Sequence, residues 1–425
     1  MQNSKIATVS VVGLGYIGLP AAAMFASRRV KVIGIDVNQH AIDTINKGKI
    51  HIVEPELDLL VHAAVTEGYL RATNSPEPAD AFIIAVPTPF KGDYEPDLSY
   101  IKAAATSIAP VLKKGDVIIL ESTSPVGTTE KMVDWLAEAR SDLKFPKSAT
   151  DTPDVHVAYC PERVLPGHVV RELVQNDRII GGMTAICSQR AVDVYRVFVD
   201  GELLVTDART AEMSKLTENA FRDANIAFAN ELSLICDRLN INVWELIKLA
   251  NHHPRVKILQ PGPGVGGHCI AVDPWFIVHS APDVAKLIRQ ARETNNSKPR
   301  WVEGKVTEAI RQVAASQGIA ETDVKIACFG LAFKANIDDL RESPSLDIVY
   351  TLAKDYRGQI VAVEPNITEV PKSLKELGVQ LYDMGTAIDS CHVIVMLVDH
   401  AEFLEIKPEL SDGQILIDTK GIWLK

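Results

Sequence analysis

Hydrophobic and polar positions alternate in blocks along the first 206 residues. Short apolar runs are separated by longer stretches with helical spacing, which is typical of a parallel sheet with helices between its strands. The expected strands are Ile6–Val12, Val30–Ile35, Ala81–Val86, Val117–Leu120, Val155–Tyr159 and Leu203–Val205. The expected helices include Pro20–Arg29, Ala41–Lys47, Tyr100–Lys113 and Thr129–Ala139. Together they predict a doubly wound α/β domain over residues 1–206.

The pattern then changes twice. Residues 207–317 carry helical spacing over Thr210–Leu249 and again from about Asp283 to Gln317, which predicts a central helical domain suited to dimerisation and to the active site. From residue 318 to 425 the alternation returns, with expected strands at Val324–Phe329, Ile360–Val363, Val393–Val398 and Ile415–Asp418. The expected fold class is therefore α/β, with two Rossmann-like doubly wound domains joined by a central helical region.

Composition and charge narrow the classes of partner. The chain has 425 residues, of which 47% are hydrophobic and 23% charged, as in ordinary globular proteins. Its 44 basic and 55 acidic side chains give 44 − 55 = −11, which argues against nucleic acid. A secretion signal and a membrane-length apolar run are not evident, so we expect a cytoplasmic protein without membrane insertion. The six scattered cysteines indicate neither a disulfide framework nor a metal site.

A glycine-rich turn follows the first expected strand and opens a helix. Its residues are Gly13, Leu14, Gly15, Tyr16, Ile17 and Gly18, in the GxGxxG spacing of dinucleotide-binding turns. Asp36 ends the second expected strand, where a carboxylate accepts the ribose hydroxyls and repels a 2′-phosphate. The turn therefore predicts an NAD site, and the alternative is a glycine turn that binds nothing.

Hydroxyl side chains follow later expected strands. Thr88 lies in AVPTPF and Thr123 in ESTSPVGTT, just past the carboxyl ends of strands, where ligands of open α/β sheets lie. The alternative is structural: Pro87 and Pro89 shape a turn, and Thr88 or Thr129 caps a helix.

One cysteine stands in a chemically distinctive loop, PGPGVGGHCIAVDPW. Cys269 follows Gly266 and Gly267 and precedes Asp273, a setting in which backbone amides face a ligand and a thiol serves as nucleophile. A nucleophilic cysteine beside an NAD site predicts aldehyde oxidation through a thiohemiacetal and a thioester. Lys215 and Asn219, four residues apart on an expected helix, are candidates to stabilise the oxyanion; the alternative is a solvated charged face.

The motifs together resemble the UDP-glucose/GDP-mannose dehydrogenase family, whose members are UDP-sugar 6-dehydrogenases. They are GLGYIGLP, AVPTPF, ESTSPVGTTE, YCPERVLPG, AEMSKLTENAFRDANIAFANE, HHPRV, GPGVGGHCIAVDPWF and FGLAFKANIDDLRESP, in that order. The forms PERVLPG and GGHCIAVDPWF look like the branch that oxidises UDP-N-acetylmannosamine. The resemblance implies a four-electron oxidation of the sugar's C6 alcohol to a carboxylate with two NAD⁺, for bacterial surface polysaccharide.

The resemblance also implies roles for individual residues. It assigns catalysis to Cys269, Lys215, Asn219, Asp273, Thr123 and Glu162, and cofactor contacts to the glycine turn with Asp36, Thr88 and Thr129. It assigns the UDP-sugar to Arg163, Val164, Lys215, Asn219, Arg222, Gly266, Phe333, Lys334 and Arg341, with Lys420 near the C-terminus. His253 and Arg255 resemble residues that the family offers across a homodimer interface.

Two departures from the family pattern stand out. Glucose-type members carry a second acidic residue shortly after Glu162, where this chain has the Leu165-Pro166-Gly167 turn; and Lys420 replaces a frequent arginine. Without the family, an aromatic and two cations at Phe333, Lys334 and Arg341 also suit a uridine diphosphate, unless Arg341 pairs with Asp338, Asp339 or Glu342.

The sequence leaves several functions open. UDP-N-acetylglucosamine and UDP-glucose are alternative substrates, a two-electron alcohol dehydrogenase is an alternative reaction, and a non-catalytic NAD-binding scaffold is an alternative class.

Overall fold

A computed structural model describes residues 6–52, 54–92, 94–164, 167–267, 269–406 and 408–423. The chain divides into two compact units, Met1–Glu218 and Asn219–Lys425. No helix within the described residues is long and apolar enough to cross a membrane.

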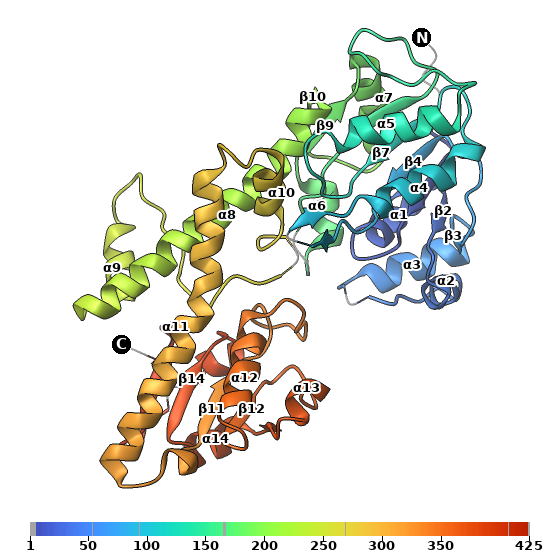
Figure 1. Ribbon diagram of the computed structural model, residues 1–425. Coiled ribbons are helices and arrows are strands. Elements are labelled where there is room, and N and C mark those ends of the chain that lie inside the picture. Colours follow the sequence, from blue (N-terminus) through green and yellow to red (C-terminus); the bar gives the residue numbers. More distant parts are fainter. Residues whose placement is uncertain are drawn as a thin grey trace. The chain divides into compact units, whose positions relative to one another are not determined.

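The first unit contains an eight-stranded sheet in the order β10-β9-β8-β7-β4-β1-β2-β3 (Figure 1). Its strands are β1 (Thr8–Val12), β2 (Lys31–Ile35), β3 (Leu70–Thr73), β4 (Ala81–Ile84), β7 (Val117–Leu120), β8 (His156–Tyr159), β9 (Arg178–Gly182) and β10 (Leu203–Asp207). The run from β3 through β1 to β8 is parallel throughout and reverses its strand order beside β1. This confirms the predicted doubly wound fold.

The edge of this sheet differs from the prediction of a wholly parallel sheet. β9 runs antiparallel to β8, and β10 then runs parallel to β9. The prediction missed β9, which begins with Arg178, and β3, which contains Arg71, because an arginine weakens the apolar signal. A small antiparallel pair, β5 (Phe90–Lys91) and β6 (Glu95–Pro96), was also not expected.

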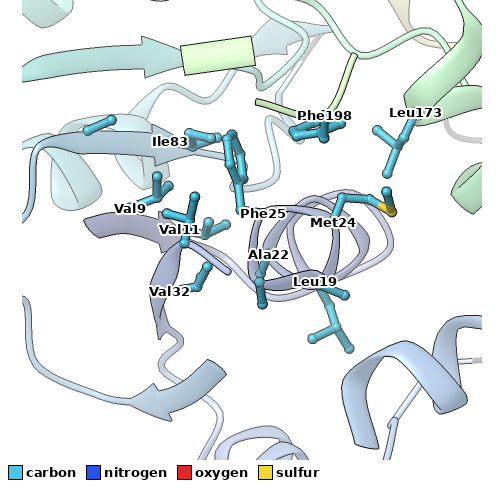
Figure 2. Close-up of a cluster of buried hydrophobic side chains, with 14 of the residues drawn as sticks. Val9, Val11, Leu19, Ala22, Met24, Phe25, Val32, Ile83, Leu173 and Phe198 are labelled. Carbon is cyan, nitrogen blue, oxygen red and sulfur yellow. The ribbon is translucent and has the colours of Figure 1, made fainter. Parts of the chain in front are cut away.

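Helices pack on this sheet through apolar residues. They are α1 (Gly18–Ser27), α2 (Gln39–Asn46), α3 (Leu57–Thr66), α4 (Ser99–Ile108), α5 (Thr128–Ala139), α6 (Val169–Gln175) and α7 (Ala185–Tyr195), with a 3₁₀ turn at Ala109–Val111. α1 is buried from Gly18 to Ala26. In Figure 2, Phe25 and Met24 point toward Phe198 and Leu173, whereas Leu19 points to the opposite side of α1. A helix buried all round is held by core packing rather than by solvent-exposed pairs.

The second unit begins within a long helix. α8 (Ala208–Leu239) runs across the boundary between the units, and α9 (Val243–Ala250), α10 (Asp273–Ser280) and α11 (Lys286–Gln317) follow it (Figure 1). The helical spacing over Thr210–Leu249 therefore corresponds to two helices. They separate at Asn240, which has a positive φ of 55°, and Asn242 caps α9 by accepting from Trp244 and Glu245.

The second unit ends in a five-stranded sheet in the order β13-β12-β11-β14-β15, all of whose pairings are parallel. Its elements are a 3₁₀ turn (Glu321–Asp323), β11 (Ile326–Phe329), α12 (Pro344–Asp355), β12 (Ile360–Val363), α13 (Lys372–Lys375), β13 (Gln380–Leu381), α14 (Met384–Ser390), β14 (Val393–Met396), α15 (Ala401–Leu404) and β15 (Ile415–Asp418). Among the five strands of this sheet, the two-residue β13 is the one that the sequence did not predict, and the helices between the strands were not predicted individually. A second Rossmann-like sheet is thus confirmed.

Candidate active site

The glycine turn after β1 has the shape that a dinucleotide needs. Gly13 has φ +92°, and a Cβ there would lie 2.5 Å from the Ala85 carbonyl oxygen. A Cβ on Gly18 would collide with the Gly13 carbonyl oxygen, so α1 begins against the turn only because this residue is glycine. Around the Cβ position of Gly15, in contrast, the described residues place no heavy atom within 4 Å apart from Gly15 and its two chain neighbours. The turn therefore packs closely against the protein at Gly13 and Gly18, and its backbone is accessible at Gly15, where a pyrophosphate approaches it.

Two polar groups beside this turn also fit NAD. Asp36 directly follows β2, and its carboxylate accepts hydrogen bonds from the backbone N–H groups of Leu14 and Asn38, each over 2.8 Å. These bonds fix the carboxylate at the edge where a ribose lies. The Thr88 hydroxyl oxygen is buried and has no hydrogen-bond partner within the described part of the chain. A buried, unsatisfied hydroxyl is costly, so it indicates a group that a ligand completes.

Thr129 is placed differently from Thr88. It lies in the first turn of α5, fully buried, and both its N–H and its hydroxyl donate to Glu212, over 2.8 and 2.6 Å. Glu212 also accepts from the Gly127 N–H, and burial raises the pKa of its carboxyl. Sequence reasoning missed Glu212, which fixes the turn after Thr123.

Candidate catalytic residues gather at the carboxyl ends of β7 and β8. Thr123 is half-buried, whereas Glu162 is 8% exposed and accepts from the Arg163 N–H over 2.6 Å and from Arg178 over 2.8 Å. Arg163 forms an ion pair with Glu218 at 2.7 Å. Val164 is half-buried, and Leu165 and Pro166 of the predicted turn lie outside the described residues.

The cysteine loop lies in the second unit. Cys269 is exposed, whereas the other five cysteines are buried. Four residues on, Asp273 begins α10, is 2% exposed and accepts from the Asn219 amide over 2.5 Å. This bond fastens the cysteine loop to α8. Lys215, half-buried, lies one turn before Asn219 on the same helix, and Arg222 is exposed one turn after it.

The same loop packs on the second Rossmann-like sheet through its glycines. The Gly267 N–H donates to the Glu342 carbonyl over 3.1 Å, and a Cβ on Gly266 would collide with that same carbonyl oxygen. Gly267 has φ +83°, and its Cβ position lies 3.0 Å from the ring of Phe333. The structure therefore brings together the cysteine loop and the Phe333 segment, which the sequence proposed separately.

Three asparagines that sequence reasoning missed hold the chain leading into this loop. Asn225 of α8 accepts from the Leu259 N–H over 2.9 Å, and Asn251 binds both the N–H and the carbonyl of Ile258. Asn230 of α8 is fully buried and accepts from the Gly262 N–H over 2.9 Å. An asparagine side chain matches a backbone amide in having both a donor and an acceptor, but sequence spacing does not reveal such distant pairs.

Most of the predicted cations for the UDP-sugar lie at the surface. Lys334, His253 and Arg255 are exposed. Arg341 forms a two-pronged ion pair with Asp339, at 2.9 and 2.7 Å, which is the alternative that the sequence left open. Lys420 pairs with Asp399 at 3.0 Å and lines an open cavity of about 530 Å³. That cavity is also lined by Trp244, Lys248, Asn251, His252, Gln260 and Gly421.

The first unit has the features of an NAD-binding oxidoreductase, namely the glycine turn, the Asp36 carboxylate and the unpartnered Thr88 hydroxyl among the described residues. The second unit adds the cysteine loop, which packs on a second Rossmann-like sheet. The sequence profiles of one family match all three regions: its NAD binding domain matches residues 7–199, its central domain 209–297 and its UDP binding domain 327–425. The chain belongs to the UDP-glucose/GDP-mannose dehydrogenase family and is an NAD-dependent UDP-sugar dehydrogenase.

Individual relatives cover nearly the whole chain. A UDP-N-acetyl-D-mannosamine dehydrogenase of Yersinia pestis is 62% identical over 98% of this chain and 99% of its own length. An NDP-N-acetyl-D-galactosaminuronic acid dehydrogenase of Ralstonia nicotianae is 61% identical over 98% of this chain and 96% of its own. Among solved structures, a UDP-D-ManNAc dehydrogenase from Pyrococcus horikoshii is 38% identical, with a TM-score of 0.85 over 98% of this chain and 96% of that one.

Proposed function

We propose that this protein oxidises the C6 alcohol of UDP-N-acetyl-D-mannosamine to a carboxylate, giving UDP-N-acetyl-D-mannosaminuronate for bacterial surface polysaccharide. The observation that carries the proposal is the exposed Cys269 in a loop that the buried Asn219–Asp273 bond fastens to α8. The 62% identity to the Yersinia pestis enzyme supports the mannosamine substrate.

Each proposed site residue has a role in the two oxidations or in the hydrolysis that follows them. The glycine turn, Asp36 and Thr88 would hold NAD⁺, which would supply the hydride acceptor for the two oxidations. Cys269 adds to the C6 aldehyde as a thiolate, and loss of hydride from that thiohemiacetal leaves a thioester, which water hydrolyses to the carboxylate and the thiol. Lys215 and Asn219 stabilise the oxyanion, and Asp273 holds the Asn219 amide in place. Thr123 and Glu162 order the water and the C6 end of the sugar.

A second candidate substrate has direct support, because the galactosaminuronic acid dehydrogenase is almost as similar as the mannosamine enzyme, at 61% against 62%. A panel of UDP-N-acetylmannosamine, UDP-N-acetylgalactosamine, UDP-N-acetylglucosamine and UDP-glucose, assayed by NADH absorbance, separates them. We expect the highest kcat/KM with the mannosamine substrate and two NADH per sugar. One NADH per sugar contradicts the thioester route, and activity confined to another sugar contradicts the substrate.

The protein is further proposed to act as a homodimer through α8. Phe221 and Phe228, 67% and 53% exposed, and Ile235 follow one another at seven-residue spacing, which places them on one face of the helix. Monomeric proteins rarely expose large contiguous apolar patches. Phe228→Asp is expected to give a monomer in sedimentation, whereas Leu59→Asp, at a more exposed site on α3, leaves the dimer intact. A Phe228→Asp dimer refutes this interface.

His253 and Arg255 are proposed to complete the partner's active site. Mixing inactive Cys269→Ser and Arg255→Ala subunits tests this, because a mixed dimer then contains one site with both native residues. Recovered activity is expected, and a mixture that stays inactive after subunit exchange shows that Arg255 serves its own subunit.

The remaining assignments rest on the family resemblance. We propose that the domains are residues 1–206, 207–317 and 318–425. We also propose that the UDP-sugar contacts Arg163, Val164, Arg222, Gly266, Phe333, Lys334, Arg341 and Lys420. A cytoplasmic location is proposed because NAD is the cofactor and the cysteines form no disulfide in the described structure.

A further inference from the structure

A buried polar cluster lies beneath the candidate catalytic edge of the first unit. We call it the Arg178 cluster: Glu121 after β7, Cys160 and Glu162 after β8, Arg178 at the start of β9, and Tyr195 at the end of α7. All five side chains are less than a tenth exposed. Because β9 reverses the direction of the sheet, its first residue reaches the ends of β7 and β8.

One guanidinium in this cluster serves two carboxyl groups. Arg178 donates to Glu162 over 2.8 Å and lies 3.4 Å from Glu121, and its guanidinium carbon lies 4.7 Å from the centre of the Tyr195 ring. The Tyr195 hydroxyl donates to the same Glu121 oxygen over 2.5 Å. The other Glu121 oxygen is buried and has no hydrogen-bond partner among the described residues.

The two carboxyl groups are therefore held unequally. Glu162 has the shorter bond to Arg178 and a second bond from a backbone N–H. Burial, with the negative charge of Glu162, raises the pKa of Glu121 to about 7, and Arg178 and Tyr195 oppose that shift. Burial also raises the pKa of the Cys160 thiol to about 12, so the thiol stays neutral and adds no charge to the cluster at neutral pH.

We propose that Glu121 is a positioning residue for the candidate active site. Through its contact with Arg178, Glu121 determines how firmly Arg178 holds Glu162. While Glu121 is neutral, it offers the guanidinium only the long 3.4 Å hydrogen bond, and the charge-assisted bond of 2.8 Å goes to Glu162. Once Glu121 ionises, the guanidinium is shared and the charge-assisted bond that fixes Glu162 weakens. The proposal rests on the proposed function, which assigns Glu162 to the hydrolytic water and the C6 end of the sugar.

Glu121→Gln tests this because glutamine has the shape of the neutral acid and cannot ionise. Below pH 6 we expect wild type and variant to have the same kcat. Above pH 8 we expect the wild-type kcat to fall about three- to tenfold relative to the variant, since small misplacements of a catalytic group cost rate. KM for the sugar and for NAD should be unchanged. A ratio of kcat values that does not vary with pH, or a change confined to KM, overturns the proposal.

Further variants keep the test decisive. Tyr195→Phe retains the ring against Arg178 but removes a donor to the ionised carboxyl, so the kcat inflection should move to higher pH. It replaces Glu121→Gln if that variant fails to fold. Glu138→Gln, at an exposed position on α5, is the matched control, and its kcat ratio to wild type should stay at one throughout.

A measurement without substrate separates this inference from the proposed function. Difference infrared spectra of the enzyme between pH 6 and pH 8 should show a protonated carboxyl band that disappears as pH rises. The band should be missing in Glu121→Gln and present in Glu138→Gln. An enzyme that shows the band but does not oxidise any sugar of the panel contradicts the function alone. Normal oxidation without the band contradicts the role of Glu121 alone.

Discussion

The Asn219–Asp273 bond can be tested by replacing the amide with a second carboxyl group. Asn219→Asp keeps the shape of the side chain but sets two carboxyl groups face to face at the 2.5 Å that now separates donor from acceptor. With an effective dielectric constant near 20, two full charges at that distance repel by about 7 kcal/mol. Because both residues are less than a tenth exposed, solvent screens little of this repulsion. One proton must therefore remain between them in the folded variant.

The sign of the pH dependence follows from that proton. In the unfolded chain both carboxyls lose their protons near pH 4. In the folded variant one carboxyl has a raised pKa, so its contribution to stability is present below about pH 4 and is lost as the pH rises through the folded value. We therefore expect the free energy of unfolding of Asn219→Asp, relative to the parent, to fall steadily between pH 4 and pH 8. The fall should be several kcal/mol and at most about 5.4 kcal/mol, because one proton contributes about 1.36 kcal/mol per pH unit.

Urea unfolding measures this if the second unit is followed by itself. Trp135 lies on α5 of the first unit, whereas Trp244, Trp275, Trp301 and Trp423 lie in the second. A Trp135→Phe background therefore confines tryptophan fluorescence to the unit that holds the contact. Asn242→Asp is the matched control, because this exposed side chain accepts from the Trp244 and Glu245 N–H groups through an oxygen that aspartate keeps. Curves of stability against pH that run parallel for the two variants would refute the contact.

Three further predictions address other parts of the protein. Cys269→Ser should lower kcat for uronate formation by roughly 10⁴-fold or more, with NAD binding unchanged in a fluorescence titration. Gly15→Ala should fold with an unchanged Tm and bind NAD about tenfold more weakly, whereas Gly18→Ala should lower Tm, since its methyl meets a backbone oxygen. Burial lowers the pKa of Lys298 from 10.5 to about 7, so the 3.5-unit difference makes stability fall by up to about 5 kcal/mol between pH 10.5 and pH 7. Lys298→Met should remove that slope in urea unfolding, and Lys305→Met, a partly exposed lysine two turns along α11, should not.

Local sequence predicted the parts of the fold and site that local physics determines. The glycine turn and Asp36 were identified because turn geometry requires glycine at Gly13 and Gly18, and because a carboxylate directly after a strand is a local signal. The same holds for Cys269, which glycines and an aspartate mark within a few residues. In β4, β7 and β14, every position is buried and apolar. The prediction therefore matched both ends of β7 and placed the C-terminal ends of β4 and β14 two residues too late.

The parts that were missed depend on contacts between distant residues. Arg178 meets Glu121 across 57 positions, and Asn230 meets Gly262 across 32. The reversed direction of β9, which brings Arg178 to that place, has no signature in its own five residues. The sequence named two possible partners for Arg341, a diphosphate and a nearby carboxylate, but it did not decide between them; in the structure Arg341 pairs with Asp339. Pairing is a property of the folded chain, so a single sequence leaves it open.

Three of the cations proposed to bind the UDP-sugar are paired with carboxylates in this acidic protein, whose net charge is −11. Arg163, Arg341 and Lys420 pair with Glu218, Asp339 and Asp399, and each pair is partly exposed to solvent. Such pairs contribute only about 0–1 kcal/mol each. A phosphate oxygen offers an arginine the same two-pronged geometry as a carboxylate with more charge, so exchanging one for the other costs little. Under the proposed assignment, positive charge is thus kept in local pairs from which a diphosphate can take it.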